Sequence, residues 1–256
     1  MSRVLITGST DGLGLLAGQL LAADGHAVTL HARTDARADD ARAALPAAEG
    51  VVVGDLSTIA GMRAVAAQAE DAGRFDAVVH NAAVGYQELQ RVETGDGLAH
   101  VFAVNVLAPY LLTALLTPPD RLVYLSSGMH RGGDPALDDL QWTRRRWNGS
   151  QAYADSKLWD AVLSAAVARR RPDVLANSVD PGWVATRMGG PGASDDLAQG
   201  PVTQAWLAVS DGDEARTSGG HWYHRARRAT HPAVSDVAVQ DGLLAACAEL
   251  SGVPLP

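Results

Sequence analysis

The sequence predicts an α/β protein with a doubly wound parallel sheet and helices on both faces. Short β-branched apolar runs alternate with longer alanine- and leucine-rich stretches of helical period. Most of these runs are apolar at consecutive positions, as strands buried on both faces are. Because such strands need a helix layer on each side, the alternation indicates a parallel sheet between two layers of helices.

The expected elements follow in order from the N-terminus. The strands are expected at residues 4–7, 27–31, 51–53, 77–80, 121–127, 174–179 and 219–223. The helical stretches are "LGLLAGQLLAADG", "TIAGMRAVAAQAEDAG", "DGLAHVFAVNVLAPYLLTALL" and "AYADSKLWDAVLSAAVARR". No repeat, low-complexity tract or linker interrupts the series, so we expect one domain over residues 1–256. The Gly- and Pro-containing segments 128–151 and 187–201 read as excursions from the sheet.

Composition and charge disfavour several classes of function. The 256 residues are 47% hydrophobic and carry a formal net charge of -8. Nucleic acid and anionic membranes are therefore unexpected partners, because both are recognised through clustered positive charge. The single cysteine, Cys247, rules out an intramolecular disulfide and suits a reducing compartment. No signal peptide or membrane span is evident, so we expect a cytoplasmic protein.

A glycine-rich stretch follows the first expected strand. In "LITGSTDGLG" the three glycines Gly8, Gly12 and Gly14 stand between an apolar run and a helical stretch. Glycine permits a tight turn and close approach of backbone N–H groups, and a helix N-terminus attracts a pyrophosphate. The stretch therefore predicts a dinucleotide cradle made by Gly8, Ser9, Thr10, Asp11, Gly12, Leu13 and Gly14. A flexible turn without a ligand is the alternative.

Further motifs follow in order, and with them the chain resembles the short-chain dehydrogenase/reductase family. The motifs are "TGSTDGLG", Asp55 in "GDL", "HNAAV" (80–84), Asn105 in "VNVLAPYLL", Ser127, "YADSK" with Tyr153 and Lys157, and "DPGWVAT" (180–186). His80 and Ala83 depart from the family's Asn-Asn-Ala-Gly element. The longer matches are similar to the retinol-dehydrogenase-like subgroup, and bacterial ketoreductases are a weaker resemblance. The resemblance implies a single-domain Rossmann-type fold and hydride transfer with a nicotinamide cofactor.

The resemblance implies a catalytic set of Asn105, Ser127, Tyr153 and Lys157. Tyr153 and Lys157 are four residues apart, so both project from one face of the expected helix. A neighbouring ammonium group favours the phenolate and brings the pKa of a tyrosine closer to neutrality. In the family roles, Tyr153 protonates the carbonyl oxygen, Ser127 positions it, Lys157 also holds the nicotinamide ribose, and Asn105 sustains a water-linked proton relay. Strand alternation sends Ser126 to the opposite face from Ser127.

Cofactor choice is expected to depend on the residues after the second strand. Ala32 stands where a carboxylate would bind the ribose, and Arg33 would attract a 2′-phosphate. We therefore expect NADP(H) to be preferred, with NAD(H) possible because Asp11 and Asp35 lie nearby. Beyond the glycine stretch, the resemblance implies cofactor contacts from Arg33, Asp55, Leu56, Asn81, Ala82, Tyr153, Lys157, Pro181, Gly182, Val184 and Thr186.

Two segments are expected to flank the nicotinamide. Residues 128–151, with Met129, His130, Trp142 and Trp147, would form one wall over the nicotinamide end. Residues 187–201 would form a mobile lid, with Trp183 and Met188 beside the substrate. These side chains suggest a bulky apolar ketone, aldehyde or secondary alcohol as substrate, although the tryptophans could equally be core packing.

Two other function classes stay open. The chain could be a catalytically silent dinucleotide-binding sensor, or an epimerase or dehydratase of the extended branch. No metal is expected, because His221, His224 and His231 lack a carboxylate-rich frame. A homo-dimer or homo-tetramer is possible.

Overall fold

The computed structural model describes residues 1–256 and contains one continuous eight-stranded sheet in the order β3-β2-β1-β4-β5-β6-β7-β8. Its strands are β1 Arg3–Ile6, β2 Ala27–Ala32, β3 Gly50–Val53, β4 Ala77–His80, β5 Arg121–Leu125, β6 Leu175–Asp180, β7 His221–Tyr223 and β8 Ala226–Arg227. All neighbours pair in parallel except β7 and β8. The expected parallel α/β fold is confirmed. Strand order reverses between β1 and β4, and ligands of such sheets bind at that point.

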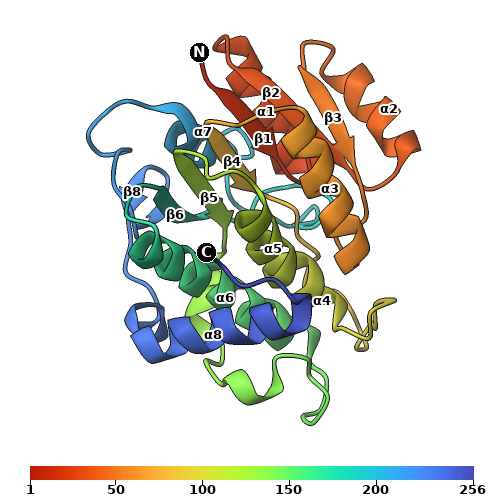
Figure 1. Ribbon diagram of the computed structural model, residues 1–256, viewed down its shortest axis with the longest axis vertical. Coiled ribbons are helices and arrows are strands. Elements are labelled where there is room, and N and C mark those ends of the chain that lie inside the picture. Colours follow the sequence, from red (N-terminus) through yellow and green to blue (C-terminus); the bar gives the residue numbers. More distant parts are fainter.

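Helices cover both faces of the sheet (Figure 1). They are α1 Gly12–Ala23, α2 Asp35–Ala44, α3 Ile59–Asp71, α4 His100–Phe102, α5 Ala108–Leu115, α6 Gly149–Arg170, α7 Val202–Val209 and α8 Val237–Ser251. Successive side chains of β1 serve the two cores, because strand residues alternate between faces. Val4 and Ile6 pack in the core of α1 and α7, whereas Leu5 packs in the larger core of α3, α5, α6 and α8.

The segment between β4 and β5 contains a π-helical turn, Ala103–Leu107, between α4 and α5. The sequence predicts one long helix here, and the structure interrupts it at Asn105. Pro109 explains part of this difference, since proline has no N–H and cannot donate to the carbonyl of Asn105 four residues earlier. Turns of this type are frequent at functional sites.

The two predicted excursions contain little regular structure. Residues 128–151 hold two short 3₁₀ turns, Gly128–Gly132 and Leu137–Asp139, before α6 begins. Residues 187–201 are irregular, and a bridge pairs Asp195 with Val184. None of the helices combines the length and the apolarity that crossing a membrane requires.

Candidate active site

A cavity of about 610 Å³ lies at the carboxyl ends of β1, β2, β4 and β5. Most of the predicted site residues meet there. Those that line it are Gly8, Thr10, Asp11, Gly12, Leu13, Arg33, Asp55, Leu56, Asn81, Ala82, Tyr153, Lys157, Pro181, Thr186 and Met188. Those that do not are Ser9, Gly14, Asn105, Ser127, Met129, His130, Trp147, Gly182, Val184 and Trp183.

The glycine loop is shaped by contacts that only glycine permits. Gly8 has φ +60, and a Cβ added there would lie 2.7 Å from the Cα of Ala82. A Cβ on Gly14 would lie 2.5 Å from Nδ2 of Asn81. That same Nδ2 donates to the carbonyls of Thr7 and Gly8, both at 2.9 Å. The glycines therefore let the loop pass within contact distance of Asn81 and Ala82 beside the cavity.

Ser9 and Gly14 support the loop from behind. The Ser9 hydroxyl donates to the carbonyl of Ile6 at 2.7 Å and accepts from the N–H of His31 at 2.8 Å. Gly14 is buried in the first turn of α1. Both residues were predicted to contact the cofactor, and the structure assigns them to the frame that positions the loop.

Two residues missed by the sequence reasoning line the end of the cavity next to β2. His31 Nδ1 accepts from the N–H of Gly8 at 2.9 Å, and His31 Nε2 donates to the carbonyl of Gly54 at 2.9 Å. Burial lowers the pKa of His31 and so favours the neutral ring that this arrangement needs. The ring thereby ties the glycine loop to the end of β3.

Arg37 is the second of these residues. Its guanidinium donates to Oγ1 of Thr10 at 2.8 Å and to Oδ2 of Asp11 at 2.7 Å. It therefore offsets the negative charge of Asp11 beside the glycine loop. Arg37 lies in the first turn of α2, and a second arginine soon after the strand that carries Arg33 was the available signal.

Tyr153 and Lys157 lie on α6, and both side chains are almost fully buried. Lys157 Nζ donates to the carbonyl of Leu125 at 2.8 Å and to Oδ2 of Asp160 at 2.7 Å, and it lies 5.7 Å from the centre of the Tyr153 ring. Burial raises the pKa of Tyr153, while Lys157 lowers it and Asp160 raises it. The lysine therefore opposes the cost that burial places on the phenolate.

Asp160 was also missed by the sequence reasoning. Burial raises the pKa of its carboxyl to about 7, and Lys157 opposes that shift. A carboxylate three residues after a lysine lies on the same helix face, so the spacing was a signal that went unused.

The two serines at the end of β5 have different partners. Ser126 borders the cavity, but its hydroxyl donates to the carbonyl of Lys157 at 2.7 Å. The hydroxyl of Ser127 accepts from the N–H of Met129 at 3.2 Å, and its contact with Tyr153 lowers the pKa of that phenol. Ser127 is thus the serine that reaches the tyrosine.

Asn105 is buried behind the cavity. Its Oδ1 accepts from the N–H of Val84 at 2.8 Å, and its Nδ2 donates to the carbonyl of Val84 at 3.1 Å and to the hydroxyl of Ser156 at 2.9 Å. The side chain is therefore committed to the loop after β4 and to α6. Asn105 does not line the cavity, so its side chain presents no polar atom there for the predicted proton relay.

The predicted substrate wall needs correction. His130 is fully buried, and its Nδ1 donates to the carbonyl of Ser127 at 2.6 Å. Trp147 donates from Nε1 to the carbonyl of Glu88 at 2.8 Å and packs edge-on against Trp142. Because both side chains are used in packing, the wall is made instead by residues of the loop after β4, the first residue of α4 and the π-helical turn: Val84, Gly85, Gln87, Glu88, His100 and Val104.

Two other predicted substrate residues do not line the cavity. Met129 is 39% exposed and Trp183 is 51% exposed, and the indole of Trp183 donates to the carbonyl of Gly189 at 3.0 Å. Of the predicted substrate residues, Met188 alone lines the cavity. The apolar character of these side chains suggested a binding role, but hydrophobicity carries no information on where a side chain points.

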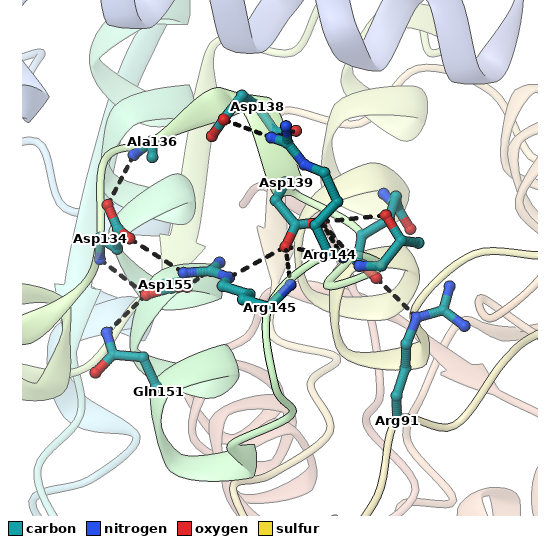
Figure 2. Close-up of polar contacts among 11 residues, drawn as sticks. Arg91, Asp134, Ala136, Asp138, Asp139, Arg144, Arg145, Gln151 and Asp155 are labelled. Carbon is teal, nitrogen blue, oxygen red and sulfur yellow. Dashed lines mark hydrogen bonds and ion pairs between the residues drawn. The ribbon is translucent and has the colours of Figure 1, made fainter.

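An ionic cluster anchors residues 128–151 to α6 (Figure 2). Arg145 donates to Oδ2 of Asp155 at 2.7 Å and to Oδ2 of Asp134 at 3.1 Å, and its guanidinium stacks 3.7 Å from the ring centre of Trp142. Asp155 is buried and also accepts from Gln151 at 2.8 Å. The insertion therefore braces the helical turn that carries Tyr153. The structure contains no group of three or more metal-ligating side chains.

Comparisons with known proteins identify relatives along the whole chain. The family model described as short chain dehydrogenase matches residues 2–129. An uncharacterised oxidoreductase of Emericella nidulans is 43% identical over all of this chain and 99% of its own length. A candidate daunorubicin C-13 ketoreductase of Streptomyces sp. is 34% identical over 88% of this chain and 83% of its own, and human retinol dehydrogenase 13 is 30% identical over 99% and 85%.

Solved structures share the fold. An uncharacterised protein from Mycobacterium paratuberculosis superposes with a TM-score of 0.85 at 25% identity, over 100% of this chain and 95% of its own. A blue fluorescent protein from a metagenomic library, solved in complex with NADPH, has a TM-score of 0.69 at 20% identity, over 87% of this chain and 95% of its own. From the family model and the whole-length relatives, the chain belongs to the short-chain dehydrogenase/reductase family and is an oxidoreductase of the class that acts on CH–OH and C=O groups.

Proposed function

We propose that this oxidoreductase is an NADP(H)-dependent enzyme that interconverts a ketone or aldehyde with its alcohol. The observation that carries the proposal is the shared cavity. Tyr153 and Lys157 face the same 610 Å³ space as the glycine loop and Arg33. A proton donor therefore lies in the same cavity as the dinucleotide cradle. Reduction of a carbonyl requires this, because the hydride and the proton must reach the same C=O group.

The glycine loop fits a dinucleotide. A Cβ at Gly8 or Gly14 would meet backbone or Asn81 within 3 Å, so glycine at both positions lets the loop lead directly into the N-terminus of α1, where a pyrophosphate can bind. Lys157 keeps one N–H free after its bonds to Leu125 and Asp160, and that proton suits a ribose hydroxyl. When bound, the nicotinamide donates or accepts the hydride.

The residues of the chain handle the proton and the carbonyl oxygen. Tyr153 donates its phenolic proton to the oxygen as negative charge develops there, and takes it back in the alcohol direction. Ser127 donates a hydrogen bond to the same oxygen and orients it. Lys157 lowers the pKa of Tyr153 against the effect of burial, so the phenol can lose its proton nearer to neutral pH.

Preference for NADP(H) is supported by two arginines. Arg33 and Arg37 both line the cavity at the end of β2, where the adenosine ribose is expected, and Ala32 supplies no carboxylate. Arg37 already bonds Asp11, so Arg33 is the better placed of the two for a 2′-phosphate.

For the substrate we propose a bulky carbonyl compound, whose apolar part would contact Val104 and Met188. Met188 belongs to residues 187–201, and we propose that this segment closes over the substrate. A silent sensor is disfavoured by the buried Tyr153 and Lys157, because a sensor has no chemical need for them. Nothing in the cavity favours an epimerase or dehydratase.

The test is the initial rate of NADPH and NADH oxidation against a panel of aromatic, aliphatic and polycyclic ketones and aldehydes. We expect turnover with NADPH that is lost in Tyr153→Phe. Arg33→Ala should raise KM for NADPH by roughly 10- to 100-fold, as loss of a charge-assisted bond predicts, and should leave NADH unaffected. Arg42→Ala, an arginine on α2 that lies outside the cavity, is the matched control. Equal use of both cofactors by the wild type would overturn the preference.

A further inference from the structure

The substrate end of the cavity holds an acid–imidazole pair that the proposed mechanism does not use. Glu88 lies in the loop after β4, and His100 begins α4. Both side chains line the cavity that contains Tyr153. His100 Nδ1 and Glu88 Oε1 are 2.6 Å apart, and the two side chains are only 23% and 17% exposed. The pair therefore faces any substrate whose carbonyl lies at Tyr153.

The contact with Glu88 determines which ring nitrogen of His100 remains available to a ligand. An ionised carboxylate can only accept, so Nδ1 carries the proton and donates to Glu88. In the tautomer that carries its single proton on Nδ1, Nε2 is a hydrogen-bond acceptor. It has no partner within the protein and is not among the buried polar atoms. A hydroxyl or N–H group on the substrate could donate the hydrogen bond that this nitrogen is free to accept.

The other carboxylate oxygen argues against a purely structural pair. Glu88 Oε2 is buried and has no hydrogen-bond partner. An unpaired buried carboxylate oxygen is costly, so such a group needs a compensating role. Holding His100 in one tautomer is a role that the geometry supplies.

The insertion holds the pair from behind. Trp147 donates from Nε1 to the carbonyl of Glu88 at 2.8 Å. Gln141 accepts at Oε1 from the N–H of Ala99, the residue before His100, at 2.8 Å. Residues 128–151 thus fix both partners without entering the cavity.

The pair is also fixed relative to the proton donor. The loop that carries Glu88 packs so closely on the first residue of α6 that a Cβ on Gly149 would collide with the Glu88 carbonyl. In the same loop Tyr86 packs edge-on against the ring of Tyr153, with centroids 5.6 Å apart. Because α6 also carries Tyr153, the two polar points of the cavity keep a constant separation.

We propose that the Glu88–His100 pair is a second binding point, and that the substrate is a carbonyl compound with a hydrogen-bond donor, a hydroxyl or N–H, remote from the reacting carbonyl. The inference rests on the proposed reductase function and names the substrate class of that same site. The apolar part of the substrate contacts Val104 and Met188, and its donor reaches His100 Nε2.

The test compares acetophenone with its three ring-hydroxylated isomers. Binding is measured by calorimetry on the enzyme loaded with NADP+, which has no hydride to donate to a ketone, and turnover is followed separately by NADPH absorbance. We expect the wild type to bind at least one hydroxylated isomer roughly 3- to 10-fold more tightly, the usual range for one neutral hydrogen bond. His100→Phe should remove that preference, so that the four ketones bind with affinities within about twofold of one another.

Two further variants make the test independent of any one substitution. Glu88→Gln should weaken the preference, because an amide no longer fixes the proton on Nδ1. Glu93→Gln, a carboxylate that pairs with Arg91 outside the cavity, should change nothing. If His100→Phe fails to fold, the comparison of the two glutamate variants decides.

The two readouts separate this inference from the proposed function. A preference that survives in His100→Phe or Glu88→Gln overturns the inference, and so does a wild type that binds all four ketones equally or binds none. A wild type that binds a hydroxylated isomer through His100 yet consumes no NADPH with any carbonyl supports the binding point and overturns the reductase function.

Discussion

The buried pair of Lys157 and Asp160 links stability to catalysis. Each side chain is only 3% exposed, and Nζ and Oδ2 are 2.7 Å apart. Lys157→Met leaves the carboxyl of Asp160 buried without its cation. Removing one partner of a buried ion pair typically costs about 3–5 kcal/mol. We therefore expect Lys157→Met to lose about that much free energy of unfolding at pH 8, in addition to its activity.

The sign of the pH dependence follows from the direction of the Asp160 shift. Burial raises the pKa of this carboxyl to about 7 in the folded protein, above its ordinary value of 3.8. Between these values the folded state holds the proton more firmly, so its contribution to stability is full below pH 4 and is lost as the pH rises through 7. Without Lys157 the pKa rises further. The loss in Lys157→Met should therefore be smaller at pH 5 than at pH 8.

The assay is urea unfolding followed by tryptophan fluorescence at pH 5 and pH 8. The double variant Lys157→Met/Asp160→Asn should recover about 2 kcal/mol or more at pH 8, because it no longer buries a charge, and should stay inactive. A Lys157→Met protein as stable as the wild type at pH 8, or a double variant no more stable than the single one, would refute this reasoning.

Two further substitutions test the frame of the site. Gly14→Ala should abolish measurable NADPH binding by fluorescence titration, because its Cβ would stand 2.5 Å from Nδ2 of Asn81 and displace the glycine loop; binding within twofold of the wild type would count against the cradle. Arg145→Met should lower the free energy of urea unfolding by about 3 kcal/mol, because it leaves the buried Asp155 without its cation. Arg144→Met, whose side chain is 60% exposed, should cost less than about 1 kcal/mol, and equal losses in the two variants would contradict the role of Arg145.

The sheet and the glycine loop could be predicted because their causes are local. Consecutive apolar residues such as Val4, Leu5 and Ile6 mark a strand buried on both faces, and glycine at a strand end marks a turn. By contrast, α2 buries only Ala38 and Ala41 and has no apolar stripe. Its N-cap Thr34, which accepts from the N–H of Arg37 at 3.4 Å, was the weak signal for its start.

Side-chain direction explains what was missed in the site. In the sequence, His130 and Trp147 resemble residues that line a pocket. In the structure their ring nitrogens donate to the carbonyls of Ser127 and Glu88 instead. The wall they were expected to form comes instead from the loop after β4 and from His100 and Val104, which the sequence pattern identifies only as a loop and as part of a long helix. Contacts between segments far apart in the chain decide such cases, and a periodic pattern does not contain them.

The central claim is a hydride transfer to a carbonyl in the cavity that Tyr153 and the glycine loop share. The most direct measurement uses NADPH deuterated at C4 of the nicotinamide, with the carbonyl panel, and mass spectrometry of the alcohols formed. We predict one deuterium on the carbinol carbon of the product, and no labelled product with Tyr153→Phe. Consumption of NADPH without deuterium in the alcohol, or full labelling by the phenylalanine variant, would contradict the account.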